Sequence, residues 1–478
     1  MITITRRTAR SLRAVFRRAF GSSRTNNPTL TFEASPHGLT VWGMHQSVVL
    51  KNQIPGEFEL ESARIPLNAL AECEAANDQP VEIEAMNTGE PDPTAVMRWD
   101  DGGIPQVVEL EAQAPADACP AIPDNMKSAS TDLLAALRDA SETTDASSSR
   151  YALDCIQLMG SSGRISGTDG KQLLVVSGFE FPWDEDLLIP GNAVFGHRDL
   201  LAATEVSIGR LDEWIVIQAG TWTIFTQIAT DGRFPDAMSY IPNRNEAQST
   251  VTIADEDADF LVKSIKRLPS DDDHHEPVTF DVNGRVVVRA QADGRQPTEL
   301  VLTNSSMDGS ATRINTNRRF IARAAKLGLR RVNLYGPDRP AHGCSDTRDY
   351  IWIPLTKDGI VEPTDGCIRI ESPAANGTQS RSRQPQPQPT RPPRKERSTT
   401  MTRSTQTRST TTAATASTPT DAAGLDAMIE SAEAVRTSLR EAATTVSRLI
   451  AELKRHRKQS KTIRTALSSL RELEAIGA

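Results

Sequence analysis

Hydrophobic and polar residues follow the same succession of patterns three times along residues 1–356. In each copy, apolar residues first recur every three or four positions, which predicts a helix; these stretches are 7–20, 130–145 and 255–268. Segments follow in which apolar and polar residues alternate, with Gly or Asn-Gly between them, as is typical of strands joined by tight turns. A further strand then leads into a second helix and more strands. The pattern therefore predicts three α+β units, each with two helices and an antiparallel sheet.

We expect these units to span residues 1–125, 126–246 and 247–356. The strand before the second helix ends in Ile-Pro in two copies and in Ile-Asn in the third. Proline suits that position because it stops strand pairing and its fixed φ fits the approach to a helix. Repeated sheet-bearing units of this kind tend to join edge to edge, and closure into a ring would remove the exposed edges.

Three segments carry a resemblance to a known family: RYALDCIQLMGSSGRISGTDGKQLLVVSGFEF (150–181), DGRFPDAMSYIPN (231–243) and DYIWIPL (349–355). In this order and spacing they resemble the bacterial replicative sliding clamp, the beta subunit of DNA polymerase III. The resemblance implies an α+β, three-domain DNA-clamp fold and a head-to-tail homodimeric ring. It also implies that helices line a central hole, that duplex DNA is held there without regard to its sequence, and that the chain has no catalytic residues and no cofactor.

The resemblance further implies a pocket for short clamp-binding motifs of DNA polymerases or repair proteins, between the second and third domains. The matching positions are Leu153, Thr168, Gly170, Lys171, Gln172, Leu173, Pro235, Ser239, Tyr240, Ile353, Pro354 and Leu355. Together they suit an apolar groove with a polar rim. The alternative interpretation is that the apolar members are ordinary core residues of strands.

DNA contacts are expected from loop positions and from basic residues on the inner helices. The loop positions that match the family are Arg24, Arg150 and Tyr151, and the helices add Arg10, Arg13, Arg17, Lys263, Lys266, Arg267, Arg318, Arg319, Arg323 and Lys326. Lys and Arg side chains on such helices neutralise phosphates without reading base sequence.

The chain also departs from the family pattern. Lys171 and Gln172 replace a His-Arg pair, and the final Met-Pro-Met is Ile353-Pro354-Leu355. The charged segment 270–276 stands where the family places apolar residues that seal the ring. We therefore interpret the chain as a divergent relative of the replicative clamp with an altered ring contact and partner preference.

The sequence beyond residue 356 does not repeat the pattern of the three units. Residues 357–423 are rich in Ser, Thr, Pro and Arg, which predicts a disordered linker, either a plain tether or a loose phosphate contact. Residues 424–476 carry mostly apolar positions at alternating steps of three and four from Met428 to Leu470, with a polar interruption at His456 and Ser460. This pattern predicts a coiled-coil helix or a helical hairpin that folds at the interruption.

Composition narrows the possible functions further. The formal net charge of −8 does not exclude DNA binding, because arginine concentrates in particular segments and only the local field acts on phosphates. The five cysteines are scattered and never form a C-x-x-C pair, which favours a reducing cytoplasm over a disulfide scaffold or zinc site. We expect a bacterial cytoplasmic, nucleoid-associated protein without a membrane span. The Arg-rich residues 1–20 also fit a mitochondrial transit peptide, but we favour a first helix of the fold.

Two segments superficially resemble a phosphate-binding loop and a metal site. GRISGTDGKQ has Ile165 and Gln172 where a phosphate-binding loop needs Gly and Ser or Thr. The run DDDHHE (271–276) rarely yields converging metal ligands, because its residues are consecutive. No other catalytic pattern is present, so we expect neither an enzyme nor a metal protein.

The leading hypothesis is a sliding-clamp-like tether that encircles DNA, is opened by a clamp loader and recruits a polymerase or repair factor. The alternative is a clamp-fold scaffold that does not encircle DNA and is oligomerised by its coiled coil. A third hypothesis is a DNA-binding scaffold that acts through the basic tail.

Overall fold

The computed structural model describes residues 1–21, 27–86, 94–111, 118–148, 151–230, 232–272 and 275–374. All of these residues lie in the first of the two units into which the chain divides, Met1–Ser382. The predicted coiled coil at 424–476 and the predicted linker from residue 375 onward lie outside the described residues. Among the helices that are described, none combines the length and apolar character needed to cross a membrane.

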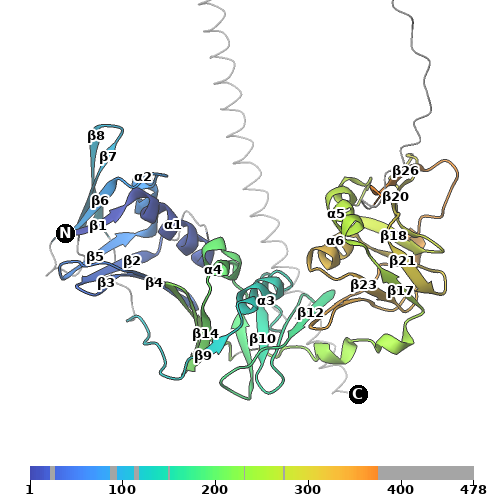
Figure 1. Cartoon of the computed structure of the whole chain (residues 1–478), viewed down its shortest axis with the longest axis horizontal. Helices are drawn as coiled ribbons and strands as arrows, with labels where there is room; N and C mark the ends of the chain where they lie inside the picture. The colour runs from blue at the N-terminus through green and yellow to red at the C-terminus, as the bar shows by residue number, and fades with distance from the viewer. Residues whose placement is uncertain are drawn as a thin grey trace, which may run out of the picture. The chain divides into compact units, whose positions relative to one another are not determined.

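One order of elements occurs three times in the first unit (Figure 1). The first copy consists of β1 (Ile2–Thr5), α1 (Arg6–Phe20), β2 (Thr29–Ser35), β3 (Gly38–His45), β4 (Val48–Ile54), β5 (Glu61–Pro66), α2 (Leu70–Cys73), β6 (Pro80–Met86), β7 (Thr94–Asp101) and β8 (Ile104–Glu111). The second consists of β9 (Lys127–Ala129), α3 (Asp132–Ser141), β10 (Cys155–Met159), β11 (Arg164–Thr168), β12 (Gln172–Ser177), β13 (Asp186–Pro190), α4 (Arg198–Leu201), β14 (Val206–Leu211), β15 (Trp214–Ala219) and β16 (Trp222–Gln227).

The third copy adds one strand, β21. It consists of β17 (Ser249–Thr252), α5 (Asp255–Ser264), β18 (Pro277–Val282), β19 (Val286–Ala290), β20 (Thr298–Leu302), β21 (Ser306–Gly309), β22 (Thr312–Asn317), α6 (Arg318–Lys326), β23 (Arg331–Leu334), β24 (Ala341–Cys344) and β25 (Arg348–Trp352). Short 3-10 turns include η2 (Ala193–Gly196), η3 (Ala237–Tyr240), η5 (Ile265–Arg267) and η6 (Lys357–Gly359), and β26 (Ile368–Glu371) ends the described chain.

Each copy contains two runs of three antiparallel strands. The first run is β2-β3-β4, β10-β11-β12 or β18-β19-β20, and the second is β6-β7-β8, β14-β15-β16 or β23-β24-β25. The opening strand of each copy (β1, β9 or β17) pairs with the first strand of the second run. The described strands thus repeat in pairing as well as in order, as the sequence pattern predicts. The expected boundaries after 125 and 246 fall in the connections before β9 and β17.

Successive copies join by antiparallel strand pairing. β4 pairs with β16 from Val48–Thr226 to Asn52–Trp222, which makes one eight-stranded sheet. β12 pairs with β25 over five residue pairs in the same way, which makes a nine-stranded sheet. In both junctions the last strand of a first run meets the last strand of the next copy's second run. The remaining sheets have four strands (β1-β6-β7-β8) and five strands (β22-β18-β19-β20-β26).

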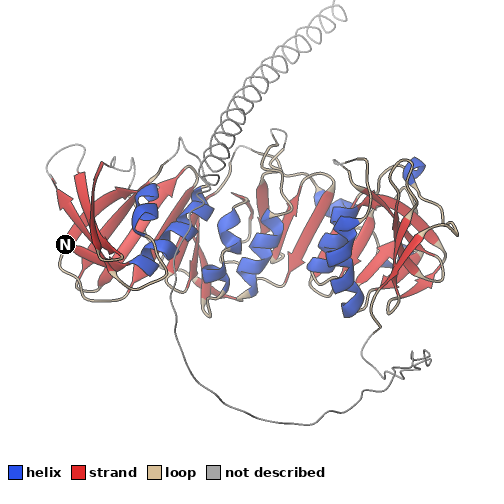
Figure 2. Ribbon diagram, turned by 90° about the horizontal axis from the view of Figure 1, so that it is seen from above, coloured by secondary structure: helices blue, strands red, loops and turns tan. Residues whose placement is uncertain are grey.

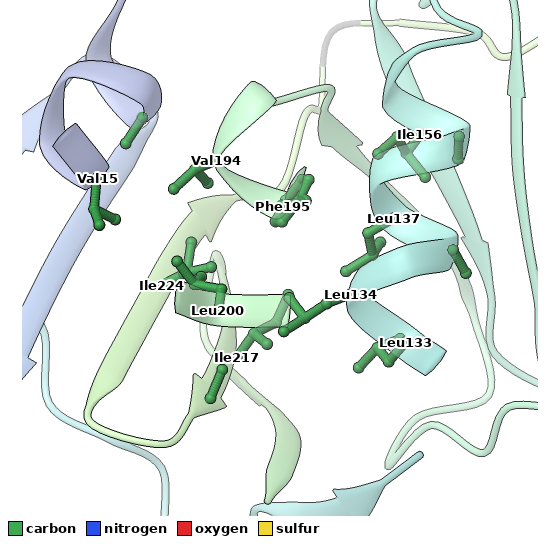
Figure 3. Packing of buried hydrophobic residues seen from close by; sticks show 14 of the residues in the cluster. Val15, Leu133, Leu134, Leu137, Ile156, Val194, Phe195, Leu200, Ile217 and Ile224 are labelled. Carbon is green, nitrogen blue, oxygen red and sulfur yellow. The ribbon is translucent and has the colours of Figure 1, made fainter. Parts of the chain in front are cut away.

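Helices and a common apolar core cover one face of these sheets (Figure 2). At the first junction Leu50 and Ile224 pair across the strands and are both fully buried. Figure 3 shows how the core continues between copies, with side chains from α1, η2, α4 and α3 converging. The labelled residues there include Val15, Val194, Phe195, Leu200 and Leu134.

The opposite face of each junction is covered by the chain segment that connects the two copies. At the first junction Val49 and Phe225 are fully buried in a cluster with Ile122 and Met126 of the connection. At the second, Leu173 and Ile351 are buried with Ala237 of the connection. Each junction is therefore buried on both faces, as in a domain core.

Residues 356–373, which we call the strap, cover one face of the five-stranded sheet, much as the connections cover the junctions. Asn315 of β22 donates its side-chain N–H to the Thr356 carbonyl (2.8 Å), and Thr279 of β18 accepts a hydrogen bond from the Val361 N–H (2.8 Å). Arg289 of β19 donates to the Val361 carbonyl (3.1 Å). The strap then pairs in parallel with β20 as β26.

The strap corrects one expectation from composition. Residues 357–373 of the strap belong to the range 357–423, for which a disordered linker was predicted, but they include η6 and β26. They are ordered because the polar face of the five-stranded sheet supplies partners for their main-chain groups. The composition of the strap itself gives no sign of this.

A glycine sets how closely α3 lies on its sheet. A Cβ atom at Gly167 of β11 would lie 2.4 Å from the carbonyl oxygen of Ala140 in α3. We expect Gly167→Ala to push α3 outward and to lower the free energy of unfolding by about 1–3 kcal/mol, as overpacked cores do. Urea denaturation would measure this. Gly366→Ala is the control, because nothing lies within 4 Å of its Cβ position; equal midpoints for the two variants would contradict the close approach.

Candidate functional site

A groove of about 1140 Å³ lies where the second and third copies meet. Its walls come from α3, the turn between β11 and β12, α5 with η5, α6, and the residues that follow β25. Five predicted pocket residues line it, namely Lys171, Gln172, Ile353, Pro354 and Leu355. Five predicted DNA contacts line it too, namely Lys266, Arg318, Arg319, Arg323 and Lys326. The structure thus brings together two sets that the sequence analysis had kept apart.

The turn between β11 and β12 is fixed by its own hydrogen bonds. Asp169 Oδ1 accepts the N–H groups of Lys171 (2.8 Å) and Gln172 (2.9 Å). Thr168 Oγ1 accepts the N–H of Gly170 (3.0 Å) and donates to the Gln172 carbonyl (2.7 Å). Gly170 has a φ of 81°, which favours glycine. The Lys171 side chain is therefore presented from a rigid turn.

Asp139 of α3 is the ionic centre of the groove wall. It is almost fully buried and accepts hydrogen bonds from Arg138 (Nε 2.8 Å, Nη2 2.6 Å) and from Arg348 Nη1 (2.9 Å) of β25. Arg323 of α6 donates to the Asp139 carbonyl (2.6 Å) and the Thr143 hydroxyl (2.8 Å). These contacts join α3 of the second copy to β25 and α6 of the third, so they hold the two walls of the groove together.

The groove combines apolar surface with positive charge. Ile353 is 52% exposed, and Val262 and Phe320 also line the walls. Lys171, Lys266 and Lys326 are exposed and have no salt bridge within the described residues, whereas each acid along the groove except Asp169 lies in a salt bridge. The surplus positive charge favours a ligand with apolar side chains and at least one anionic group.

The other predicted pocket residues lie elsewhere or face away from the groove. Leu173 is buried against Ile351, Ala237 and Phe234, so it is a core residue in this structure. Pro235, Ser239 and Tyr240 belong to the connection that covers this cluster, with Tyr240 69% exposed. Leu153 lies beside Gly170, whose Cβ position is 3.9 Å from the Leu153 Cδ1. The set predicted as one pocket is thus divided between the groove and the cluster around Leu173.

Arg318 corrects the prediction of DNA contacts. Its side chain is almost fully buried and donates to the carbonyls of Leu268 (2.6 Å), Pro269 (2.9 Å) and Glu276 (3.1 Å). Burial lowers the pKa of Arg318, but the carbonyl oxygens satisfy its N–H groups. The side chain fastens α6 to the segment after η5 and is not available to a phosphate.

Other predicted contacts are held in ion pairs. Arg13 pairs with Glu74 (2.6 Å), Arg319 with Glu276, and Arg323 with Glu142 (3.2 Å). The remaining basic residues of the set on the helices are exposed, namely Arg10, Arg17, Lys263, Lys266, Arg267 and Lys326. They lie on α1, α5, η5 and α6, and Figure 1 shows α1, α5 and α6 on the same side of the sheets.

The predicted loop contacts are described only in part. Tyr151 is 64% exposed and has a φ of 58°. A positive φ is uncommon for a residue other than glycine. Arg24 and Arg150 lie outside the described residues.

In the described part of the chain no group of three or more His, Cys, Asp and Glu side chains is placed to hold a metal ion. Burial raises the pKa of the Cys73 and Cys119 thiols to about 11 and that of Cys155 to about 12. These thiols therefore stay protonated near neutral pH.

Comparison with solved structures identifies the architecture. The DNA polymerase III beta subunit of Pseudomonas aeruginosa is 17% identical, with a TM-score of 0.58 over 74% of this chain and 99% of that one. The chain has the fold of bacterial DNA sliding clamps. The sliding clamp of Bacillus subtilis (17% identity, TM-score 0.60, 74% and 98% covered) and the beta subunit of Streptococcus pyogenes (13%, 0.60, 74% and 99%) match similarly. No protein-family model and no curated protein matches the sequence.

The clamp fold explains what the sequence analysis missed at the groove. Arg138 and Asp139 on α3, Glu142 directly after it, and Phe320 on α6 line the groove but belong to none of the family motifs. They reach the groove because strand pairing brings two copies together, which no local spacing reveals. The one available signal was the density of charged residues at the end of the predicted helix 130–145.

We expect Asp139→Asn to lower the free energy of unfolding by about 1–3 kcal/mol, because two arginines lose a shared, buried carboxylate. Asp132→Asn is the matched control on the same helix, where the carboxylate is exposed. Urea denaturation of both variants would measure the difference. If the two variants were equally stable, Asp139 would not hold the groove walls together.

Proposed function

We propose that this protein is a sliding-clamp-like tether, in which two copies close into a ring around duplex DNA. The observation that carries the proposal is the repeated edge-to-edge joining of copies, with exposed Arg and Lys residues on helices that share one side of the sheets. Such side chains attract phosphates without reading sequence. The match to proteins described as DNA polymerase sliding clamps supports the proposal.

The groove serves in this proposal as the docking site for a polymerase or repair factor. Its exposed Ile353, the neighbouring Leu355 and Phe320 would take apolar side chains of a short peptide, and Lys171 would take a carboxylate. A Pseudomonas aeruginosa sliding clamp of the same fold (18% identity, TM-score 0.59) has been solved with griselimycin bound. The protein itself has no catalytic part in this scheme.

Topological binding to DNA gives a direct test. With a clamp loader and ATP, we expect the protein to stay on nicked circular DNA in high salt and to leave when the circle is cut. Salt weakens phosphate contacts steeply, so a ring held by topology alone survives it. Retention is measured by gel filtration of labelled protein before and after cutting.

A replicative clamp loaded in parallel shows that the loader is active. If that clamp is retained, while neither this protein nor a variant whose strap is released from β20 is retained, the encircling function is wrong, and the scaffold that does not encircle DNA replaces it.

The docking site has its own test. We expect Leu355→Asp to weaken binding of a fluorescent clamp-binding peptide at least about tenfold, because it places a charge on the apolar wall of the groove. Leu60→Asp is the matched control, since Leu60 is 86% exposed and does not line the groove. Fluorescence anisotropy measures the affinity, and equal loss in both variants would contradict the assignment.

A further inference from the structure

The repeat leaves two strands in the described chain without the junction partner that it predicts. The last strand of each first run is β4, β12 or β20, and the last strand of each second run is β8, β16 or β25. β4 pairs with β16 and β12 pairs with β25, in both cases antiparallel over five residue pairs. By the same rule β20 would pair with β8 of another copy.

β8 has the surface expected of a strand that pairs with another copy. Among the described strands it pairs with β7 alone, and Ile104 and Val107 are each 63% exposed. An open edge of eight residues with exposed aliphatic side chains is one that proteins ordinarily cover.

The edge of β20, however, is already occupied by the chain's own strap. β26 pairs with it from Thr298–Ile368 to Val301–Glu371. Arg369 binds the buried carboxylate of Glu299 (2.6 Å), and Thr303 donates its N–H to the Ser372 hydroxyl (2.9 Å). The strap thus takes the place that the repeat assigns to the next copy.

We infer that β26 is a self-inhibitory strand, which must leave β20 before β8 of a second copy can pair there. This inference rests on the proposed function, because it concerns the closure of the proposed ring. It assigns the edge of β20 two alternative occupants, the strap within one chain and β8 between two chains.

The contacts of β26 are weaker than those of the internal junctions. β26 forms four residue pairs in parallel, whereas each internal junction forms five antiparallel pairs, which are more stable per residue. Ile368 and Ile370 remain 50% and 43% exposed, whereas Leu50 and Ile224 at the first junction are fully buried. A strand that buries so little of its apolar surface is suited to exchange.

The direction of the main-chain groups allows a sharp test. The N–H of Ile368 donates to the Pro297 carbonyl and that of Ser372 to the Val301 carbonyl, so by alternation the N–H of Ile370 faces β20 and that of Glu371 faces away. Ile370→Pro therefore removes a bond to β20, while Glu371→Pro leaves that pairing intact. The two variants are matched in position and in residue type.

The experiment places a photo-cross-linking amino acid at Val107 in the full chain and identifies the cross-linked peptides by mass spectrometry. We expect Ile370→Pro to raise cross-linking between copies to residues 298–302 about tenfold, and Glu371→Pro to leave it unchanged. Hydrogen exchange at residues 368–371 verifies that the strap is released only in Ile370→Pro. An unchanged yield in Ile370→Pro after verified release overturns the inference. Cross-linking of the unaltered chain to residues 368–371 also overturns it, because β26 would then itself be the pairing edge.

Retention on circular DNA separates this inference from the proposed function. If the unaltered protein is retained on the circle while Ile370→Pro leaves cross-linking unchanged, the strap is not inhibitory and the encircling function stands. If Ile370→Pro raises cross-linking, but neither the unaltered protein nor Ile370→Pro is retained on the circle, the strap controls assembly and the encircling function is wrong.

Discussion

Antiparallel main-chain pairing between copies is the constraint on which the rest of this structure depends. Each copy alone would leave the outermost strand of its first run open, with unpaired N–H and C=O groups along it. The pairing of β4 with β16 and of β12 with β25 satisfies those groups and fixes the register of neighbouring copies residue by residue. Helix placement, the groove and its ionic contacts follow from that register.

The groove illustrates how a binding surface arises from such pairing. Its apolar wall comes from the residues after β25, its rigid turn lies between β11 and β12, and its charged walls come from α3 and α6. None of these elements forms a pocket by itself. Asp139 then ties the walls together, because it takes arginine contacts from its own helix and from β25. The groove and the fold therefore depend on the same ionic centre.

The sequence was a good guide to the repeating elements and a poor one to long-range contacts. Periodicity located the first helix of each copy, and α1 runs from Arg6 to Phe20 where 7–20 was expected. It did not reveal that Leu173 is buried by a connection or that Arg318 binds carbonyls, because both depend on segments far away in sequence. The strap was missed for the same reason, since its partners lie on β18, β19 and β20.

The distance along the chain between junction partners has a consequence for synthesis on the ribosome. β4 ends at Ile54, but its partner β16 begins only at Trp222. The open edge of β4 therefore stays unpaired until nearly all of the second copy has left the exit tunnel. During that interval the nascent chain is vulnerable to pairing with another nascent chain on the same messenger, and fast elongation through the second copy would shorten the exposure.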